Sequence, residues 1–419
     1  MKTQPANRWV ILAASCFVTL CIGSLYAWSA FSGPMAEWLA ECMGAPVDSL
    51  AMVFTVANAV GPVTMIAGGA VNDKLGPKKV LLLGGLLFGG GMIGSGFVRN
   101  VWTLIVSYGL GVGLGVGLIY GVTVSNTVKF FPDKAGLAGG VITACYGASS
   151  MIVPPAAAAL TRSYGVNAAF WIIGAVMSAI LCASALVICP CPAEFSAARP
   201  EEARNGGKDR ELRWNEMLRE PEFYLMLLAL TCGAFAGMMV ISQASQLAQE
   251  LMGLGVTGSA LMVSAVALFN ALGRLASGAL SDRLGATGTL RLTLLLSCGA
   301  NLLLFLSGGK SLWLTGASLG AVGFSFGSIM GVYPGFTAAR FGRSGNSVNY
   351  GIMFIGFALA GLLGPMLMNR IRAGMGRCQP AFLAAAVLAA VGETLILVLH
   401  SRLHRERQCA VPLAEDRSN

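Results

Sequence analysis

Long apolar stretches alternate with short polar segments along almost the whole chain. Twelve stretches have about the 20 residues that a helix needs to cross the hydrocarbon core of a bilayer. The predicted spans are residues 9–31, 49–70, 80–98, 102–127, 136–160, 167–189, 222–247, 257–280, 290–307, 312–336, 346–368 and 379–400. The longest polar segment, 190–221, separates the sixth span from the seventh. We therefore expect an all-α membrane protein with a six-helix bundle over 1–189, a linker, and a second six-helix bundle with a tail over 222–419.

The two predicted bundles share a loop sequence. G-A-V-N-D-K-L-G follows span two and G-A-L-S-D-R-L-G follows span eight, with Asp73 and Asp282 209 residues apart. The residues expected to act in these loops are Gly69, Asp73, Gly76, Gly278, Asp282 and Arg283. An aspartate near a helix end can latch the ends of neighbouring helices, so we expect these loops to switch conformation. Two pseudo-symmetric six-helix repeats are a recurring architecture of transporters.

Composition and charge place the chain in a membrane and orient it. The chain is 55% hydrophobic and 11% charged, whereas soluble domains carry about 25% charged residues. Of the 28 Lys and Arg, six fall in loops on one side, Arg274 lies inside a span, and the remaining 21 are on the other side. By the positive-inside rule we expect both termini and 190–221 to be cytoplasmic, in a multi-pass plasma-membrane protein. The net charge of +9 thus reflects topology and does not indicate nucleic-acid binding.

Motifs of catalysis are not visible in the sequence. The eleven cysteines are scattered, mostly within apolar segments, without metal-ligand spacing. A nucleotide-binding loop or a nucleophile–base pair is also missing. We therefore expect a protein that is not an enzyme and that uses neither a metal nor a cofactor. Separately, we expect the chain to work as a monomer.

Arg274 is the most informative residue. It lies in an otherwise uncharged stretch, 256–280, where a guanidinium costs roughly 2.5–3.5 kcal/mol on insertion scales. The acids near or inside spans that could pair with it are Glu250 and Glu393. A cation at this depth indicates a protein that handles anions, and the alternative is a structural ion pair.

The loops after spans two and eight carry a family resemblance. G-x-x-x-D-[KR]-x-G in both halves resembles the signature loop of the major facilitator superfamily. With the span count and the repeat positions, the resemblance covers the whole chain. It implies a secondary transporter that works by alternating access.

A narrower resemblance rests on residues in spans one, eight and eleven. N-R-W at 7–9, C-I-G-S-L-Y-A-W-S-A-F at 21–31, N-x-x-G-R ending at Arg274 and N-Y-G at 349–351 look like the oxalate:formate antiporter family, which includes bacterial monocarboxylate transporters. In that family the arginine of span eight binds the substrate carboxylate. The oxalate-exchanging member also has a lysine in span eleven, where this chain has Phe357, and this difference argues against dianion exchange.

Helix geometry groups the candidate site residues by depth. At a rise of about 1.5 Å per residue, Arg274, Tyr120, Tyr146 and Phe357 fall about 12–16 Å from the nearer helix ends, close to the bilayer midplane. Asn270, one turn before Arg274, shares its helix face. The expected substrate-binding residues are Arg274, Asn270, Tyr120, Tyr146, Phe357, Phe354, Phe326 and Tyr26. Each aromatic residue could instead contact lipid or pack between helices, and Tyr26 could belong to an interfacial belt.

These observations favour a transporter of small monocarboxylates of the lactate, pyruvate or formate type, coupled to protons or working by anion exchange. Glu250 and Glu393 are the candidate proton carriers, although each has a structural alternative. The competing interpretations are an oxalate:formate-type exchanger and a membrane receptor that senses an organic acid without moving it. The sequence shows no signalling domain, which argues against the receptor.

Overall fold

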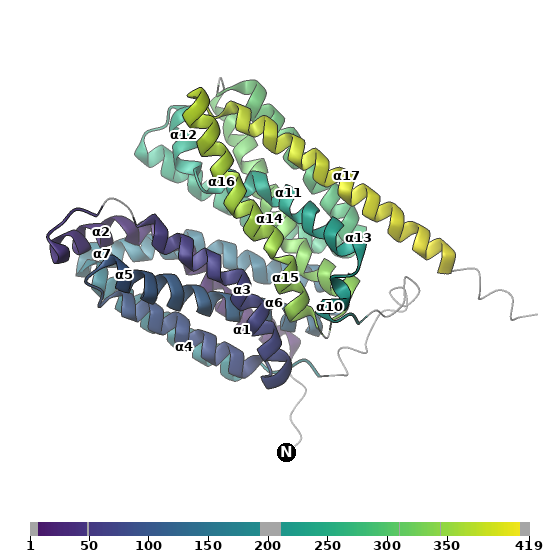
Figure 1. The fold of residues 1–419 in the computed structure, drawn as a ribbon, viewed down its shortest axis with the longest axis horizontal. Helices are drawn as coiled ribbons and strands as arrows, with labels where there is room; N and C mark the ends of the chain where they lie inside the picture. Colours follow the sequence, from purple (N-terminus) through teal and green to yellow (C-terminus); the bar gives the residue numbers. More distant parts are fainter. Residues whose placement is uncertain (1–6, 48–49, 193–210, 310, 344, 411–419) are drawn as a thin grey trace, which may run out of the picture. The chain divides into compact units, whose positions relative to one another are not determined.

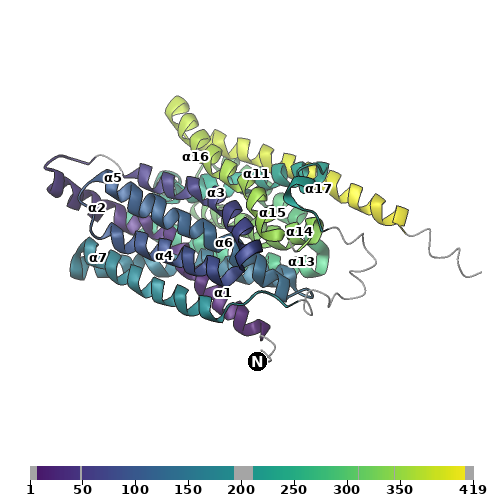
Figure 2. The ribbon, with the colours of Figure 1, turned by 60° about the horizontal axis from the view of Figure 1, so that its bottom comes forward.

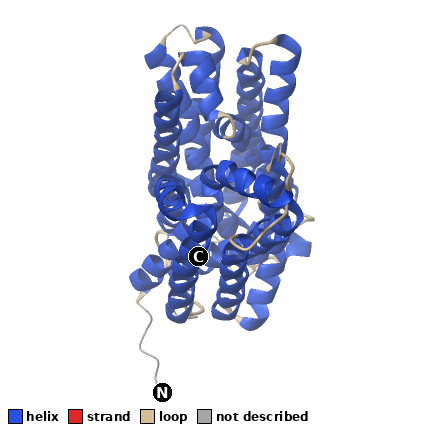
Figure 3. Cartoon of the chain, turned by 90° about the vertical axis from the view of Figure 1, so that its left-hand side faces the viewer, coloured by secondary structure: helices blue, strands red, loops and turns tan. Residues whose placement is uncertain are grey.

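The computed structural model describes residues 7–47, 50–192, 211–309, 311–343 and 345–410. Over these ranges the chain forms helices and connecting loops, and no strand occurs in them (Figure 3). The prediction of an all-α protein is confirmed.

The helices are labelled in Figure 1. The N-terminal half contains α1 (Arg8–Ile22), the 3₁₀ segment η1 (Gly23–Ala27), α2 (Trp28–Met43), α3 (Ala51–Leu75), α4 (Pro77–Ser95), α5 (Val101–Leu104), the π-helical segment η2 (Ile105–Val112), α6 (Gly113–Phe130) and α7 (Ala135–Val187). The C-terminal half contains α10 (Trp214–Met217), α11 (Pro221–Ile241), α12 (Ala244–Met252), α13 (Val256–Ser307), α14 (Leu312–Phe341), α15 (Asn346–Met353), α16 (Ile355–Met375) and α17 (Gln379–Ala410).

The twelve predicted spans are all present in the described residues, some with altered boundaries. Nine helical stretches there are long and apolar enough to cross a membrane. Two of the nine, in α7 and α13, each join two helices at a glycine with positive φ, Gly165 (83°) and Gly285 (75°). Counting these as four helices and adding α4, which has 19 residues, gives twelve.

The chain divides into two compact units. Unit 1 consists of Met1–Phe130, Val141–Cys191 and Gly345–Ile352, and unit 2 of Phe131–Gly140, Pro192–Ser344 and Met353–Asn419. Each unit therefore includes a short segment from the opposite half of the sequence. The start of α7 belongs to unit 2, and most of α15 belongs to unit 1.

Unit 1 is built around α6. This helix contacts α1, α3 and α4, and Figure 2 shows it between α3 and α4. Nearly every residue from Gly113 to Phe130 is buried. A Cβ atom added at Gly115 would lie 2.7 Å from the backbone nitrogen of Phe88 in α4. Glycine in α6 thus permits the close approach typical of membrane helices.

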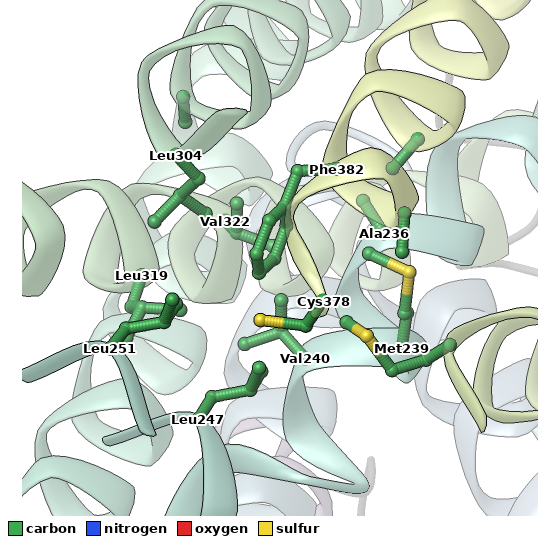
Figure 4. Packing of buried hydrophobic residues seen from close by; sticks show 14 of the residues in the cluster. Ala236, Met239, Val240, Leu247, Leu251, Leu304, Leu319, Val322, Cys378 and Phe382 are labelled. Carbon is green, nitrogen blue, oxygen red and sulfur yellow. The ribbon is translucent and has the colours of Figure 1, made fainter. Parts of the chain in front are cut away.

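Unit 2 packs α11, α13, α14, α16 and α17 against one another, and α12 covers one end of its core. Figure 4 shows Leu247 and Leu251, one turn apart on α12, beside Cys378, Leu319 and other buried apolar residues. The short amphipathic helix α12 therefore docks through one face, and its opposite face is left for polar contacts.

Candidate functional site

Arg274 is buried in the middle of unit 2. Its side chain lies on α13 and the residue is 3% exposed. Its Nε donates a 2.8 Å hydrogen bond to Oδ1 of Asn270, one turn earlier. The guanidinium carbon also lies 6.0 Å from the centre of the Phe326 ring. Asn270 and Phe326 thus orient the planar group that the sequence singled out.

Close backbone packing between α13 and α14 fixes the helix face that carries Arg274. A Cβ atom at Gly327 would lie 1.9 Å from the carbonyl oxygen of Asn270, so only glycine fits there. Ser277 and Ser328 each donate a hydrogen bond to a carbonyl of the other helix, at 3.0 and 3.2 Å. Small residues and hydroxyl groups therefore bring the helices together at the level of Arg274.

Arg274 is the one buried charge without an acidic partner in the described part of the chain. Three charged residues are buried there, Glu222, Arg274 and Glu393, and all belong to unit 2. Glu222 is held by two nitrogens of Arg340, and Glu393 by Arg291 at 2.9 Å. Among the described residues, only Asn270 hydrogen-bonds the guanidinium, and it uses Nε. The two terminal nitrogens of Arg274 are therefore available to a ligand.

Three of the predicted aromatic residues lie together in unit 2. The Phe326 and Phe357 rings stack with centres 6.2 Å apart, and Phe354 stacks on Phe357 at 4.5 Å. Phe354 lies at the break between α15 and α16, where span eleven is interrupted. The backbone of Phe354 nevertheless stays in the right-handed helical region, with φ −67° and ψ −10°. The break was not predicted, because Phe354 is not a residue that ordinarily ends a helix.

The remaining predicted aromatic residues belong to unit 1. Tyr120 on α6 and Tyr146 on α7 are both buried and pack edge to face, with ring centres 5.1 Å apart. The side chain of Tyr26 lies outside the described residues, although its backbone belongs to η1. The centre of unit 1 therefore offers an aromatic pair and no buried charge among its described residues.

The two acids considered as proton carriers lie in ion pairs. Glu250 on α12 is 3.0 Å from Nη2 of Arg372, whose Nη1 also donates to Gln243 and Gln246. Burial and the neighbouring Glu250 carboxylate raise the pKa of the Cys378 thiol, between α16 and α17, to about 12. Glu393 pairs with Arg291 between α17 and α13. Neither acid is hydrogen-bonded to Arg274.

The predicted switch loops differ in their contacts. In unit 2, the Asp282 carboxylate accepts 2.8 Å hydrogen bonds from the backbone nitrogens of Gly136 and Leu137, and so caps the first turn of α7. A Cβ atom at Gly136 would lie 2.6 Å from the carbonyl of Gly278, so this turn packs directly on α13. Arg283 is exposed in the same loop.

In unit 1 the equivalent contact is made by α3 and α15. A Cβ atom at Gly69 would lie 2.7 Å from the backbone of Ser347, and Asn72 donates a 3.3 Å hydrogen bond to the Ser347 hydroxyl. Asp73, next to Asn72, is exposed. Gly76 ends α3 with a φ of 76°, close to the 75° of Gly285 in the second loop. The loop backbone is thus repeated, whereas the side-chain contact is not.

Comparison with known proteins identifies the family. The Major Facilitator Superfamily model matches residues 16–365. The chain belongs to this superfamily. Its membership confirms the wider of the two resemblances read from the sequence, and it makes the protein one of a family of multi-pass membrane transporters.

Relatives in the superfamily agree with the narrower resemblance. The oxalate:formate antiporter of Oxalobacter formigenes is 27% identical over 98% of this chain and 96% of its own length. Monocarboxylate transporter 11 of Mus musculus is 27% identical over 93% of this chain and 87% of its own. An uncharacterized MFS-type transporter of Escherichia coli (strain K12), YhjX, is 27% identical over 85% and 86%.

Solved structures show the same fold. The Escherichia coli fucose:proton symporter FucP aligns with a TM-score of 0.71 and 14% identity, covering 94% of this chain and 99% of that protein. The human organic anion transporter MFSD10 aligns with a TM-score of 0.70 and 18% identity, covering 94% and 100%. The twelve-helix fold of the superfamily is therefore confirmed.

Proposed function

We propose that this protein is a secondary active transporter of small monocarboxylates of the lactate, pyruvate or formate type, and that Arg274 anchors the carboxylate. The observation that carries the proposal is the burial of Arg274 without an acidic partner among the described residues. A buried charge costs several kcal/mol unless it is compensated. An anionic substrate would supply that compensation each time it binds.

The proposed binding chemistry follows from the geometry around the guanidinium. Asn270 occupies Nε, which leaves the terminal nitrogens to form paired hydrogen bonds with the two oxygens of a carboxylate. Phe326, Phe354 and Phe357 would exclude water and so strengthen these bonds. We assign Tyr120 and Tyr146 to the substrate-binding surface of unit 1, where their hydroxyl groups would contact polar substituents of the substrate.

Oxalate:formate-type exchange is the second candidate. The relative of that name, which matches nearly the whole chain, favours it. Two anionic carboxylates call for two cations, however, and the position of the second cation in that family is occupied here by Phe357. We therefore rank monocarboxylate transport first.

Transport would proceed by alternating access, either coupled to protons or as anion exchange. Both candidate proton carriers, Glu250 and Glu393, are paired with an arginine, and each would have to leave that arginine before it could take up a proton. This cost disfavours proton coupling through these residues and so supports anion exchange. We propose that the contact of Asp282 with the start of α7, and that of Gly69 with α15, form and break during the cycle. Both contacts are made by residues of the shared loop sequence.

We further propose that the chain works as a monomer in the plasma membrane, with both termini and the 190–221 linker in the cytoplasm. Cysteines placed singly at 205 and 310, which lie outside the described residues, test this orientation in a variant without native cysteines. An impermeant maleimide added outside should label position 310 and miss position 205. The reverse pattern would overturn the orientation.

Uptake into proteoliposomes tests the function. Labelled lactate, pyruvate, formate and oxalate would each be offered to the purified protein with and without a pH gradient, and with and without trapped unlabelled anion. Saturable uptake of the monocarboxylates supports the proposal. Stimulation by the pH gradient would indicate proton coupling, and stimulation by trapped anion would indicate exchange. Binding without uptake of any of the four would favour the receptor.

A further inference from the structure

A surface cavity of about 360 Å³ opens at one end of unit 1, where α4 gives way to α5. Its lining residues are Gly94, Phe97, Val98, Arg99, Asn100, Thr103 and Ser107. Neither the predicted substrate residues nor the shared loops contribute to it.

The cavity carries one charge, that of Arg99. Among the described residues this exposed side chain has no acidic or hydrogen-bonding partner. The side-chain oxygen of Asn100 accepts a 2.8 Å hydrogen bond from the backbone nitrogen of Thr103, so its amino group remains as a second donor. A guanidinium and an amide donor at the rim favour an anion.

Phe97 is the aromatic residue that lines the cavity, and three tryptophans are adjacent in sequence to its lining residues or contact them. Phe97 and Trp102 are 68% and 76% exposed, and the Phe97 ring lies 4.8 Å from that of Trp171. Trp38 donates a 3.2 Å hydrogen bond to the carbonyl of Val98 and so holds the connection in place. Exposed tryptophans next to a cation are typical of the level of the lipid headgroups.

One wall of the cavity is formed where α4 packs closely against the π-helical segment η2. Ser107, on the π-helical segment η2, accepts a 3.1 Å hydrogen bond from the hydroxyl group of Ser95 on α4. A Cβ atom at Gly91 would lie 2.6 Å from the Ser107 carbonyl, so α4 and η2 touch through their backbones. Wide π-helical turns frequently occur at functional sites.

We propose that this cavity binds the phosphate of an anionic phospholipid. Arg99 and Asn100 would donate to the phosphate oxygens, and the acyl chains would lie along the outer face of α4, where Leu83 and Leu86 are exposed. A free phosphate would bind weakly, because the one cation in the cavity is screened by solvent. A phospholipid would bind more tightly, because its acyl chains add apolar contacts with Phe97 and with the leucines of α4. The site is independent of the transported substrate.

Native mass spectrometry of the full chain, purified with phosphatidylglycerol or phosphatidylcholine, tests the proposal. We expect Arg99→Gln to retain about fivefold less phosphatidylglycerol than the unmodified protein, because it removes the one cation that lines the cavity. Arg162→Gln, which removes another exposed arginine of unit 1, should retain the normal amount. Phosphatidylcholine carries the same phosphate, but its ammonium group offsets the charge, so it should bind the unmodified protein more weakly than phosphatidylglycerol does and lose less than about fivefold in Arg99→Gln.

A competition with glycerol 3-phosphate separates the lipid from a free phosphate. At millimolar concentration it should leave phosphatidylglycerol bound, because the apolar contacts remain. Complete displacement by glycerol 3-phosphate would overturn the lipid assignment. Equal lipid retention by Arg99→Gln and the unmodified protein, or an equal loss in Arg162→Gln, would overturn the site. Size-exclusion profiles establish that both variants remain folded, as expected for exposed positions.

Discussion

The two units repeat their helices and loops but not their chemistry. Unit 2 buries Arg274, whereas unit 1 buries the Tyr120–Tyr146 pair. In the shared loops, Asp282 caps α7 with its charge, whereas the contact in unit 1 is made by the neutral side chains of Asn72 and Ser347. At these two places unit 2 thus uses a charged side chain where unit 1 uses neutral ones. A repeated backbone thus sets the positions of side chains and leaves their roles free to diverge.

The largest effect is expected from changes to the buried charge of unit 2, Arg274. We expect Arg274→Lys to weaken carboxylate binding by about 100-fold or more, because a point charge cannot replace two planar hydrogen bonds of about 1.5–3 kcal/mol each. Competitive inhibition of uptake in proteoliposomes measures the affinity. Tyr120→Phe is the matched change in unit 1, and it should weaken binding by about tenfold at most. A larger effect of Tyr120→Phe would contradict the division of roles.

Asn270 offers a sharper test of charge. Asn270→Asp preserves the acceptor for Nε but places a carboxylate beside the guanidinium, so it should compete with the substrate and weaken binding by about 30-fold. Asn270→Ala removes only the orienting hydrogen bond, and we expect a loss of about fivefold. Substrate affinity measured in both variants decides between the two effects. If the aspartate variant binds as well as the alanine variant, the unpaired charge of Arg274 does not drive recognition.

Substitution of the two loop aspartates, Asp73 and Asp282, is expected to have the smallest effect, a change in thermal stability. Asp282→Asn removes a charge that accepts two backbone hydrogen bonds at a helix N-terminus, a contribution of about 0.5–2 kcal/mol. We expect its thermal unfolding midpoint to fall by about 1–4 °C. Asp73→Asn, the equivalent change, should leave the midpoint within about 1 °C, since the hydrogen bond to Ser347 comes from Asn72. Equal shifts in the two variants would show that the loops are equivalent after all.

Much of the fold could be predicted because it depends on local patterns. Span length and hydropathy were sufficient for twelve helices, and the helix period was sufficient to place Asn270 beside Arg274. The positive φ of Gly76 and Gly285 also agrees with their place in the repeated loop.

Long-range contacts and helix irregularities could not be predicted in the same way. The pairs Arg291–Glu393 and Glu250–Arg372 join segments about 100 residues apart or more, and hydropathy does not show which helices are neighbours. The irregular segments η1 and η2 and the junction at Phe354 were not predicted either. Gly23 begins η1 and Gly109 lies within η2, but both resemble many other glycines of the chain, so the local sequence does not mark these positions.

The most direct test of the central claim, that one unpaired guanidinium selects monocarboxylates, is competition between lactate and oxalate for the unmodified protein in liposomes. Oxalate would leave a second charge beside Phe357, an uncompensated cost of several kcal/mol in a dry site. We expect oxalate to inhibit labelled lactate uptake about 100-fold more weakly than unlabelled lactate does. Equal inhibition by the two anions would contradict it.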